Sequence, residues 1–378
     1  MKYDFNYVSP KLKALLEPAS KKPHYFQGDL SFKEYTDSFI IPFISWDQLV
    51  GSGQDNHYNI LDSSVTDSPV KESLDVQDAV TEHKTVIYLG FLPGVFGHGF
   101  TDNYRTLWFL DTKACKDYLE SGAEFIYTSN FNKPLSDTYA RLLQMAGFDI
   151  RKARLIDRLT KFDKIILPDS TFIDSDYGRL YCDGFCTILD RVRDHISKIP
   201  TDPAYDKIYF TRTKFQYRKE SGEEKIEDYF RQAGFTIISP EQYPLDTQLQ
   251  MIRSCSCFAS TEGSVAHISL FCKPGTKVII VNKANYMNEY QIAINEIADL
   301  DVTYIQAHHS SVADHDHPWW GPFFLYPTKY LRRFFGYTSA GLPYWLSKDY
   351  WSYYFGNNPK TRLLKKLYRY IKHPHLTE

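Results

Sequence analysis

The chain has 378 residues, of which 43% are hydrophobic and 24% are charged, a composition typical of folded globular proteins. Its 44 lysines and arginines nearly balance its 46 aspartates and glutamates, and the formal net charge of -2 argues against a dedicated nucleic-acid binder. No stretch approaches the ~20 apolar residues of a membrane-spanning helix, and the first 22 residues carry no apolar secretory core. We therefore expect a cytoplasmic protein, long enough for two domains, whose six cysteines are free thiols.

The first half of the chain alternates between short apolar strands and helices from residue 84 onward. Between a strand and a helix lies the loop FLPGVFGHGF at 91–100, whose three glycines and one proline predict close backbone approaches. A single helix is expected to follow, capped by Thr101 or Asp102, with its apolar face running from Tyr104 to Leu119. Two prolines within residues 200–203 mark a domain boundary. The other elements expected here are strands at 38–46, 85–89, 125–127 and 164–167 and helices at 136–145 and 179–199.

The second half repeats the alternation more regularly. This pattern predicts a parallel, doubly wound α/β sheet that binds its ligand at the carboxyl ends of the strands. The turn at 261–264 lies at such an end and is predicted to open a helix, whose free amides and dipole favour an anion. The expected strands are 208–211, 236–239, 257–260, 277–281 and 302–305, and the expected helices are 223–233, 245–254, 265–271 and 289–298.

The end of the chain, residues 313–378, is aromatic and basic. Residues 361–373 place apolar side chains on one helical face and basic ones on the other. Such a helix either docks back onto the body of the protein or lies against anionic lipid headgroups at the inner face of the plasma membrane. Both readings stay open from the sequence.

A histidine-rich stretch offers a rival enzyme class. Read alone, it suggests a metal site and a metal-dependent hydrolase, although its spacing matches no ligand pattern with a helical or strand rationale. A polar interdomain loop is the favoured interpretation, and a non-catalytic nucleotide- or sugar-binding protein is a third hypothesis. The residues concerned are His308, His309, Asp314, His315, Asp316 and His317.

Four stretches of the chain carry motifs that belong together. They are Phe96–Phe100 with Asp102, Arg105, Leu107 and Trp108; Ile208–Arg212 with Arg218 and Gly222–Glu224; Gly234–Phe235 with Ser239–Glu241 and Gln248; and Thr261–Ser264 with His267, Phe271 and Lys273–Gly275. In this order they resemble glycosyltransferase family 61 in the form found in bacterial capsular and surface polysaccharide clusters. Glu262 stands where many members have histidine, and Gly222 where many have asparagine.

The resemblance implies a GT-B-like fold with two Rossmann-like domains and a C-terminal helical and aromatic tail. Residues 1–200 would form the acceptor side, 201–312 would bind the nucleotide sugar, and 313–378 would cross back to the first domain. It further implies an inverting, metal-independent transferase without a cofactor. The expected donor is a UDP-sugar, and the expected acceptor is a growing polysaccharide or a glycolipid.

A sugar transferase of this kind needs a grip on the donor diphosphate and a base for the acceptor hydroxyl. Arg212 and Lys214 follow a strand's carboxyl end, where they would reach the diphosphate. For the base, His98, Asp102 and Glu262 remain alternatives, since Asp102 could instead orient His98 or cap its helix, and Glu262 could instead contact ribose or sugar hydroxyls. The full set expected to bind the donor is Arg212, Lys214, Arg218, Glu223, Glu262, Gly263, Ser264, Val265 and His267.

Overall fold

The computed structural model describes residues 2–44, 60–61, 76–175, 178–217, 220–309, 321–339 and 341–357. Arg218, residues 310–317 of the histidine-rich stretch and the basic segment 361–373 lie outside these ranges, so the expectations for them stay predictions. Within the ranges, no helix is both long enough and apolar enough to span a bilayer.

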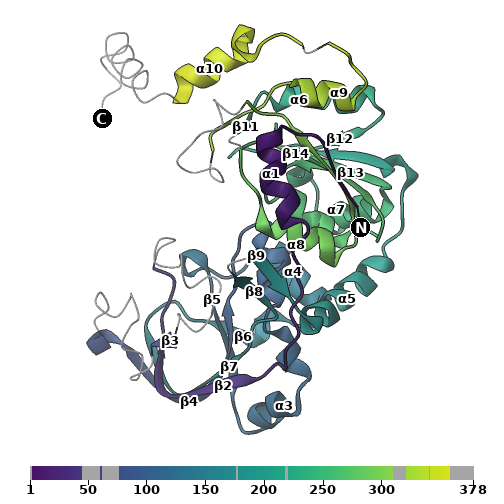
Figure 1. Ribbon diagram of the computed structural model, residues 1–378. Helices are drawn as coiled ribbons and strands as arrows, with labels where there is room; N and C mark the ends of the chain where they lie inside the picture. The colour runs from purple at the N-terminus through teal and green to yellow at the C-terminus, as the bar shows by residue number, and fades with distance from the viewer. Residues whose placement is uncertain are drawn as a thin grey trace, which may run out of the picture.

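The C-terminal half is built on a six-stranded sheet in which every pairing is parallel (Figure 1). Its central strands are buried apolar runs, as expected for a parallel sheet covered on both faces. The predicted parallel α/β sheet is therefore confirmed. The strand order is β1 (Lys2–Tyr7), β15 (Asp301–Gln306), β14 (Lys277–Asn282), β13 (Cys257–Thr261), β10 (Lys207–Phe210) and β12 (Thr236–Ile238), and the connections hold α6 (Glu223–Gln232), α7 (Leu245–Ser254) and α8 (Glu289–Ile297).

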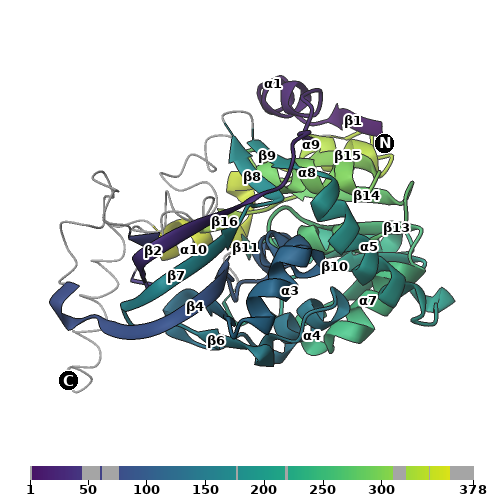
Figure 2. The same cartoon turned by 90° about the horizontal axis from the view of Figure 1, so that it is seen from below.

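The start of the chain belongs to this C-terminal sheet. We expected residues 1–200 to lie together, but β1 pairs in parallel with β15 along the sheet edge, and α1 (Pro10–Ala19) follows it (Figure 2). The Phe5 ring lies 5.7 Å from the Tyr304 ring across this pairing. The added strand covers the edge of β15, which would otherwise present unpaired backbone groups.

The N-terminal half carries a second six-stranded sheet. The strands β7, β4, β5 and β6 are parallel neighbours, whereas β2 runs antiparallel to β7 and β3 antiparallel to β2. The sheet is thus mixed, with an antiparallel edge. Its order is β3 (Ile60–Leu61), β2 (Phe32–Ile40), β7 (Thr160–Pro168), β4 (Val80–Phe91), β5 (Glu124–Thr128) and β6 (Ala153–Leu155), and its helices are α3 (Lys113–Glu120), α4 (Asp137–Met145) and α5 (Asp183–Ser197).

Two predicted helices of this half differ from the structure, one in type and one in its limits. The segment after Asp102 forms short 3-10 turns over 98–100, 102–104 and 107–111 before α3 begins. Thr171 donates its backbone N–H and its hydroxyl to the Arg105 carbonyl, which removes that acceptor from a continuous helical ladder. The helix expected over 179–199 begins only at Asp183, because residues 178–181 form β9 (Gly178–Tyr181), the partner of β8 (Phe172–Ser175) in a hairpin.

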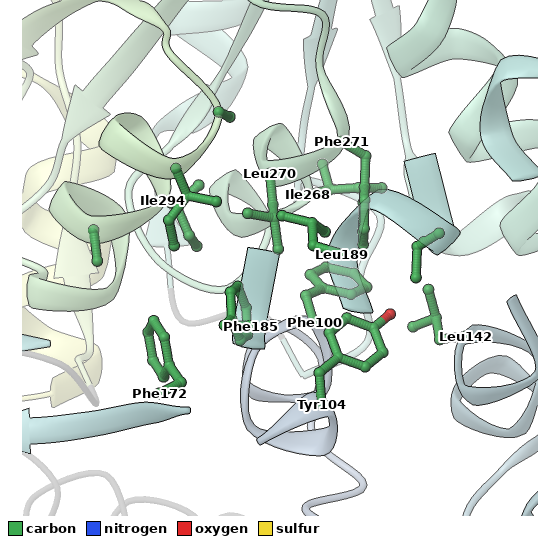
Figure 3. Close-up of a cluster of buried hydrophobic side chains, with 14 of the residues drawn as sticks. Phe100, Tyr104, Leu142, Phe172, Phe185, Leu189, Ile268, Leu270, Phe271 and Ile294 are labelled. Carbon is green, nitrogen blue, oxygen red and sulfur yellow. The ribbon is translucent and has the colours of Figure 1, made fainter. Parts of the chain in front are cut away.

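One hydrophobic core runs through both halves. Figure 3 shows Phe100 and Tyr104 of the N-terminal half facing Ile268, Leu270 and Phe271 of the C-terminal half. The rings of Phe100 and Phe271 lie 5.4 Å apart and nearly perpendicular. This packing fixes the loop that carries His98 against the turn that carries Glu262.

The described part of the C-terminal tail packs along the C-terminal half. The short strand β16 (Phe323–Phe324) pairs with β11 (Glu220–Ser221), and α9 (Lys329–Phe334) packs against β15 and β1. The last helix described is α10 (Lys348–Asn357).

Candidate active site

A cavity of about 450 Å³ opens between the two halves at the carboxyl ends of β10, β13 and β14. From β10 the chain adds β12 on one side of the sheet and then crosses over to add β13 on the other side of β10. Open α/β sheets bind their ligands at such a topological switch point. The predicted residues that line the cavity are His98, Arg212, Glu262, Gly263, Ser264 and His267, and the residues that the sequence did not indicate are Tyr217, Glu220, Lys283, Ala284, Tyr286, Asn288, Tyr290 and Phe323.

His98 and Asp102 form a hydrogen-bonded pair at the cavity wall. His98 Nδ1 lies 3.1 Å from Asp102 Oδ2, and Tyr290 donates its hydroxyl to the same oxygen across 3.2 Å. Since a carboxylate only accepts, Nδ1 is assigned the proton, which leaves the Nε2 of His98 as an acceptor. The His98 side chain is 42% exposed, whereas that of Asp102 is 5% exposed. The geometry therefore makes His98 the accessible member and Asp102 the one that orients it.

The surroundings of Asp102 stabilise the ionised form of its carboxyl. Burial acts to raise the pKa of this carboxyl, but the nearby Arg105 guanidinium and the hydrogen bond from His98 lower it well below its usual range. Asp102 is consequently ionised at neutral pH and can stabilise a positive charge that develops on His98.

Two cations that line the same cavity as His98 share one buried carboxylate. Glu220 Oε1 is 2.6 Å from Lys283 Nζ, and its Oε2 is 3.5 Å from Arg212 Nε. The side chain of Glu220 is 2% exposed, whereas those of Lys283 and Arg212 are 11% and 22% exposed. One carboxylate against two cations leaves a net positive charge in a poorly hydrated site, which suits a phosphate group.

Glu262 and His267 are buried polar side chains with unmet hydrogen-bonding capacity. Glu262 accepts from Asn282 Nδ2 at 2.6 Å through Oε2, but its Oε1 has no partner among the described residues. Burial raises the pKa of Glu262 to about 8, against the opposing charge of Lys283. Among the described residues, neither ring nitrogen of His267 makes a hydrogen bond of good geometry, although the Asn288 side chain and the Gly97 backbone lie near the ring. Burial lowers the pKa of His267 to about 3. At neutral pH both side chains are uncharged and available to a ligand.

The turn between β13 and the next helix differs from the prediction. A six-residue 3-10 helix (Ala266–Phe271) replaces the expected α-helix, so the dipole at its start is small. The turn nevertheless lies at the cavity, and Gly97 from the other half packs on it so closely that a Cβ there would approach Ser264 Cα to 2.9 Å. The 3-10 helix therefore offers an anion less than the side-chain cations Arg212 and Lys283 of the same cavity do.

Three predicted donor-binding residues lie away from this cavity. Lys214 is exposed and lines a different hollow with Thr213 and Arg231. Glu223 is fully buried, where it accepts from the Tyr209 hydroxyl at 2.9 Å and from the Arg212 amide, so it supports the loop of Arg212. Val265 is buried and faces a neighbouring cavity.

The residues missed by sequence reasoning had little local signal. Lys283 directly follows β14, and the rule that ligands bind at strand carboxyl ends would have indicated it. Tyr290 lies in the first turn of α8, where an aromatic residue at helical spacing reads as core.

Of the histidine-rich stretch, His308 is buried, with ring nitrogens 3.2 Å from the Asn282 carbonyl and from Asn285 Oδ1. The described ranges contain no group of three or more His, Cys, Asp or Glu side chains that could hold a metal ion.

Comparison with known proteins agrees with this geometry. Residues 96–279 match the family model described as Glycosyltransferase 61, and this span includes His98, Arg212, Glu262 and His267. No curated protein matches the chain. The resemblance noted in the sequence is thereby confirmed at the level of the family. Residues 96–279 are similar to glycosyltransferase family 61, and the protein is a glycosyltransferase.

Proposed function

We propose that this glycosyltransferase is an inverting enzyme that moves a sugar from a nucleotide-sugar donor, a UDP-sugar, to a hydroxyl of a growing bacterial capsular or surface polysaccharide or glycolipid. The observation that carries the proposal is that an oriented His98 and the Arg212 and Lys283 cations line one and the same cavity. Two α/β halves that meet at this cavity support a GT-B arrangement.

In the proposed reaction, His98 acts as the base. The acceptor oxygen attacks C1 of the donor sugar, the bond from C1 to the β-phosphate oxygen breaks, and the nucleoside diphosphate leaves with that electron pair. The proton of the acceptor hydroxyl passes to Nε2 of His98, and Asp102 stabilises the resulting imidazolium. One displacement at C1 inverts its configuration. Base catalysis of this kind contributes about 10²–10⁴-fold to a rate.

Arg212 and Lys283 stabilise the departing diphosphate. Their fixed positive charges face the oxygen on which charge develops, so the proposed mechanism needs no metal ion. Glu262 fits a different role from that of the base, because a carboxyl that is protonated at neutral pH donates a hydrogen bond. We assign it to a hydroxyl of the donor sugar. The free thiols of all six cysteines support a reducing, cytoplasmic location.

A transfer assay with purified protein tests the proposal. We expect one nucleoside diphosphate in a panel to raise the melting temperature, and its sugar conjugate to act as donor in the presence of excess chelator. His98→Ala should lower the transfer rate about 10²–10⁴-fold while nucleotide binding persists. His83→Ala is a matched control, because His83 forms the same contact with Asp163 at 3.0 Å on the open surface.

Three outcomes contradict the proposal. Full activity of His98→Ala excludes this residue as the base. Loss of transfer in chelator that is restored by a divalent cation shows that a metal takes part. Retention of the anomeric configuration in the product excludes a single displacement.

A further inference from the structure

A second cavity, of about 620 Å³, adjoins the first, and Arg212 and Ser264 line both. We name the first cavity the histidine lobe, after His98, and the second the aromatic lobe. The walls of the aromatic lobe come from the loops at 94–96 and 130–139 of the N-terminal half and from residues 211–215 and 240–248 of the C-terminal half. Its rings belong to Phe96, Phe131, Tyr139, Phe215 and Tyr243.

Two of these rings belong to exposed side chains. Phe131 is 60% exposed although its ring lies 5.4 Å from that of Phe43, and its backbone takes a φ of 60°, which is unusual for a bulky residue. Tyr243 is 40% exposed, and the guanidinium of Arg212 lies over the Phe215 ring at 4.8 Å. Exposed aromatic faces along a cavity are suited to stacking against a flat ring.

Gln248 supplies the lobe with a directed hydrogen-bond acceptor. The side chain is 6% exposed, and its Nε2 donates to the carbonyls of Pro240 and Tyr243 at 2.9 and 3.0 Å. These two contacts fix the orientation of the amide and turn Oε1 to a place where no described residue donates to it. A buried, oriented acceptor of this kind selects a ligand that carries an N–H or O–H donor.

Resting on the proposed function, we propose that the aromatic lobe binds the nucleoside of the donor, with the diphosphate at Arg212 and the sugar in the histidine lobe. A nucleotide sugar has an anionic centre with a nucleoside on one side and a sugar on the other. The two lobes, joined at the Arg212 cation, repeat that order. The acceptor hydroxyl must reach His98, so the acceptor shares the histidine lobe with the donor sugar and leaves the aromatic lobe to the nucleoside.

The position of the lobe in the sheet supports the same assignment. Residues 211–215 and 240–248 follow the carboxyl ends of β10 and β12, where parallel α/β sheets bind nucleotides. The base stacks among the exposed rings, and Gln248 Oε1 accepts an N–H from its edge. Glu241, which is exposed in the same wall, is placed to accept from the ribose hydroxyls.

Titration calorimetry with two ligands, a nucleoside diphosphate and inorganic pyrophosphate, tests this assignment. We expect Tyr243→Ala and Gln248→Leu each to weaken the nucleoside diphosphate about tenfold and to leave pyrophosphate affinity unchanged. Arg212→Ala should weaken both ligands. Gln250→Leu makes the same change on α7 outside either lobe and should alter neither affinity. Because Gln248→Leu removes two contacts to backbone carbonyls, its melting temperature is recorded, and the exposed Tyr243 provides the independent variant.

Unchanged nucleoside diphosphate affinity in both folded variants overturns the nucleoside assignment and leaves the proposed function standing, provided that Arg212→Ala still weakens binding. A raised KM for the acceptor without any change in nucleotide affinity also overturns it, because the lobe then holds the acceptor saccharide. A wild-type protein that binds pyrophosphate but no nucleoside diphosphate overturns the proposed function as well.

Discussion

The phenol of Tyr290 in the C-terminal half donates to the Asp102 carboxylate of the N-terminal half across 3.2 Å. The ring of Tyr290 also lies 4.7 Å from that of His98, stacks on His267 at 5.8 Å and has the Arg179 guanidinium 4.1 Å from its centroid. One side chain thus connects the C-terminal half of the protein to the His98–Asp102 pair, which we propose activates the acceptor. The orientation of His98 depends on how the two halves are joined.

Tyr290→Phe keeps the ring and removes only the hydroxyl. Asp102 then loses one of its donors, and we expect the transfer rate to fall about tenfold, in line with a hydrogen bond to a charged group worth ~1.5 kcal/mol. Nucleotide affinity should not change. Steady-state kinetics and calorimetry measure the two effects, with Tyr337→Phe, whose hydroxyl meets Gln232 on the surface, as the control. An unaltered rate would show that Tyr290 has no part in positioning the pair.

Asp102→Asn preserves the shape of the side chain but removes its negative charge. The amide cannot stabilise an imidazolium on His98, so we expect the transfer rate to fall at least about 10²-fold, close to the effect of His98→Ala. The double variant should be little worse than either single variant, because the two residues act as one unit. Multiplicative losses in the double variant would refute that coupling.

Glu220→Gln should lower the stability of the protein and raise its affinity for nucleotide. Without its negative charge, Arg212 and Lys283 face each other unpaired, and we expect the unliganded protein to lose ~3 kcal/mol of unfolding free energy. A bound diphosphate restores the missing charge, so nucleotide affinity should rise, whereas Lys283→Met should lower it. Chemical denaturation and calorimetry record the two quantities. Weaker nucleotide binding in Glu220→Gln would mean that Glu220 positions the cations rather than competing for them.

His267 and Glu262 should give the protein opposite responses to pH. The pKa of His267 falls from about 6.5 when unfolded to about 3 when folded, so the unfolded chain binds the extra proton, and stability is lost as the pH falls below 6.5. The pKa of Glu262 rises from about 4.5 to about 8, so the folded state binds the extra proton, and stability is lost as the pH rises from 4.5 to 8. The two contributions partly cancel between pH 4.5 and 6.5.

Variants of His267 and Glu262 separate the two contributions to the pH dependence of the unfolding free energy. Between pH 7 and pH 5, the stability of His267→Gln relative to wild type should improve by about 2 kcal/mol. Between pH 5 and pH 8, the relative stability of Glu262→Gln should improve by a few kcal/mol. Urea denaturation at each pH provides the measurement, and parallel curves for a variant and the wild type would exclude the corresponding shift.

A matched pair of glycine variants tests the junction between the halves. Gly97 and Gly122 both have a left-handed φ, of +96° and +92°. A Cβ at Gly97 would lie 2.8 Å from His267 Nδ1, whereas a Cβ at Gly122 would have nothing within 4 Å. The backbone strain is common to both, so Gly97→Ala should cost ~1–3 kcal/mol more than Gly122→Ala and should also lower the transfer rate. Equal losses in the two variants would show that the junction tolerates the methyl group.

Most elements of the C-terminal half could be predicted because their apolar runs and helical periods are strong and local. The limits predicted for α7, Leu245–Ser254, match the structure. The helix expected at Val265 was wrong because hydrophobic spacing over six or seven residues does not distinguish an α-helix from a 3-10 helix. The place of β1 could not be predicted, since its pairing with β15 joins residues almost 300 positions apart.

The difference between local patterns and contacts that only the fold creates also applies to the site. His98 and Asp102 are four residues apart, so a local motif brings them to notice, and the structure does bring them into contact. Glu220, Lys283 and Tyr290 line the same cavity only because of the fold, and they carry no motif. Lys214 was expected near the diphosphate from its spacing after a strand, but the chain turns it to the exposed face. Position after a strand predicts the edge on which a residue lies and not the direction of its side chain.

The shared packing around Phe100 and Phe271 bears on how the enzyme releases its product. If the two halves swung apart as rigid bodies, these rings would be exposed to water, a cost that grows with every square ångström uncovered. Turnover is therefore better served by shifts of the segments that border the cavities. The same continuity means that neither half would be stable if expressed alone, and heating should produce one calorimetric peak instead of two.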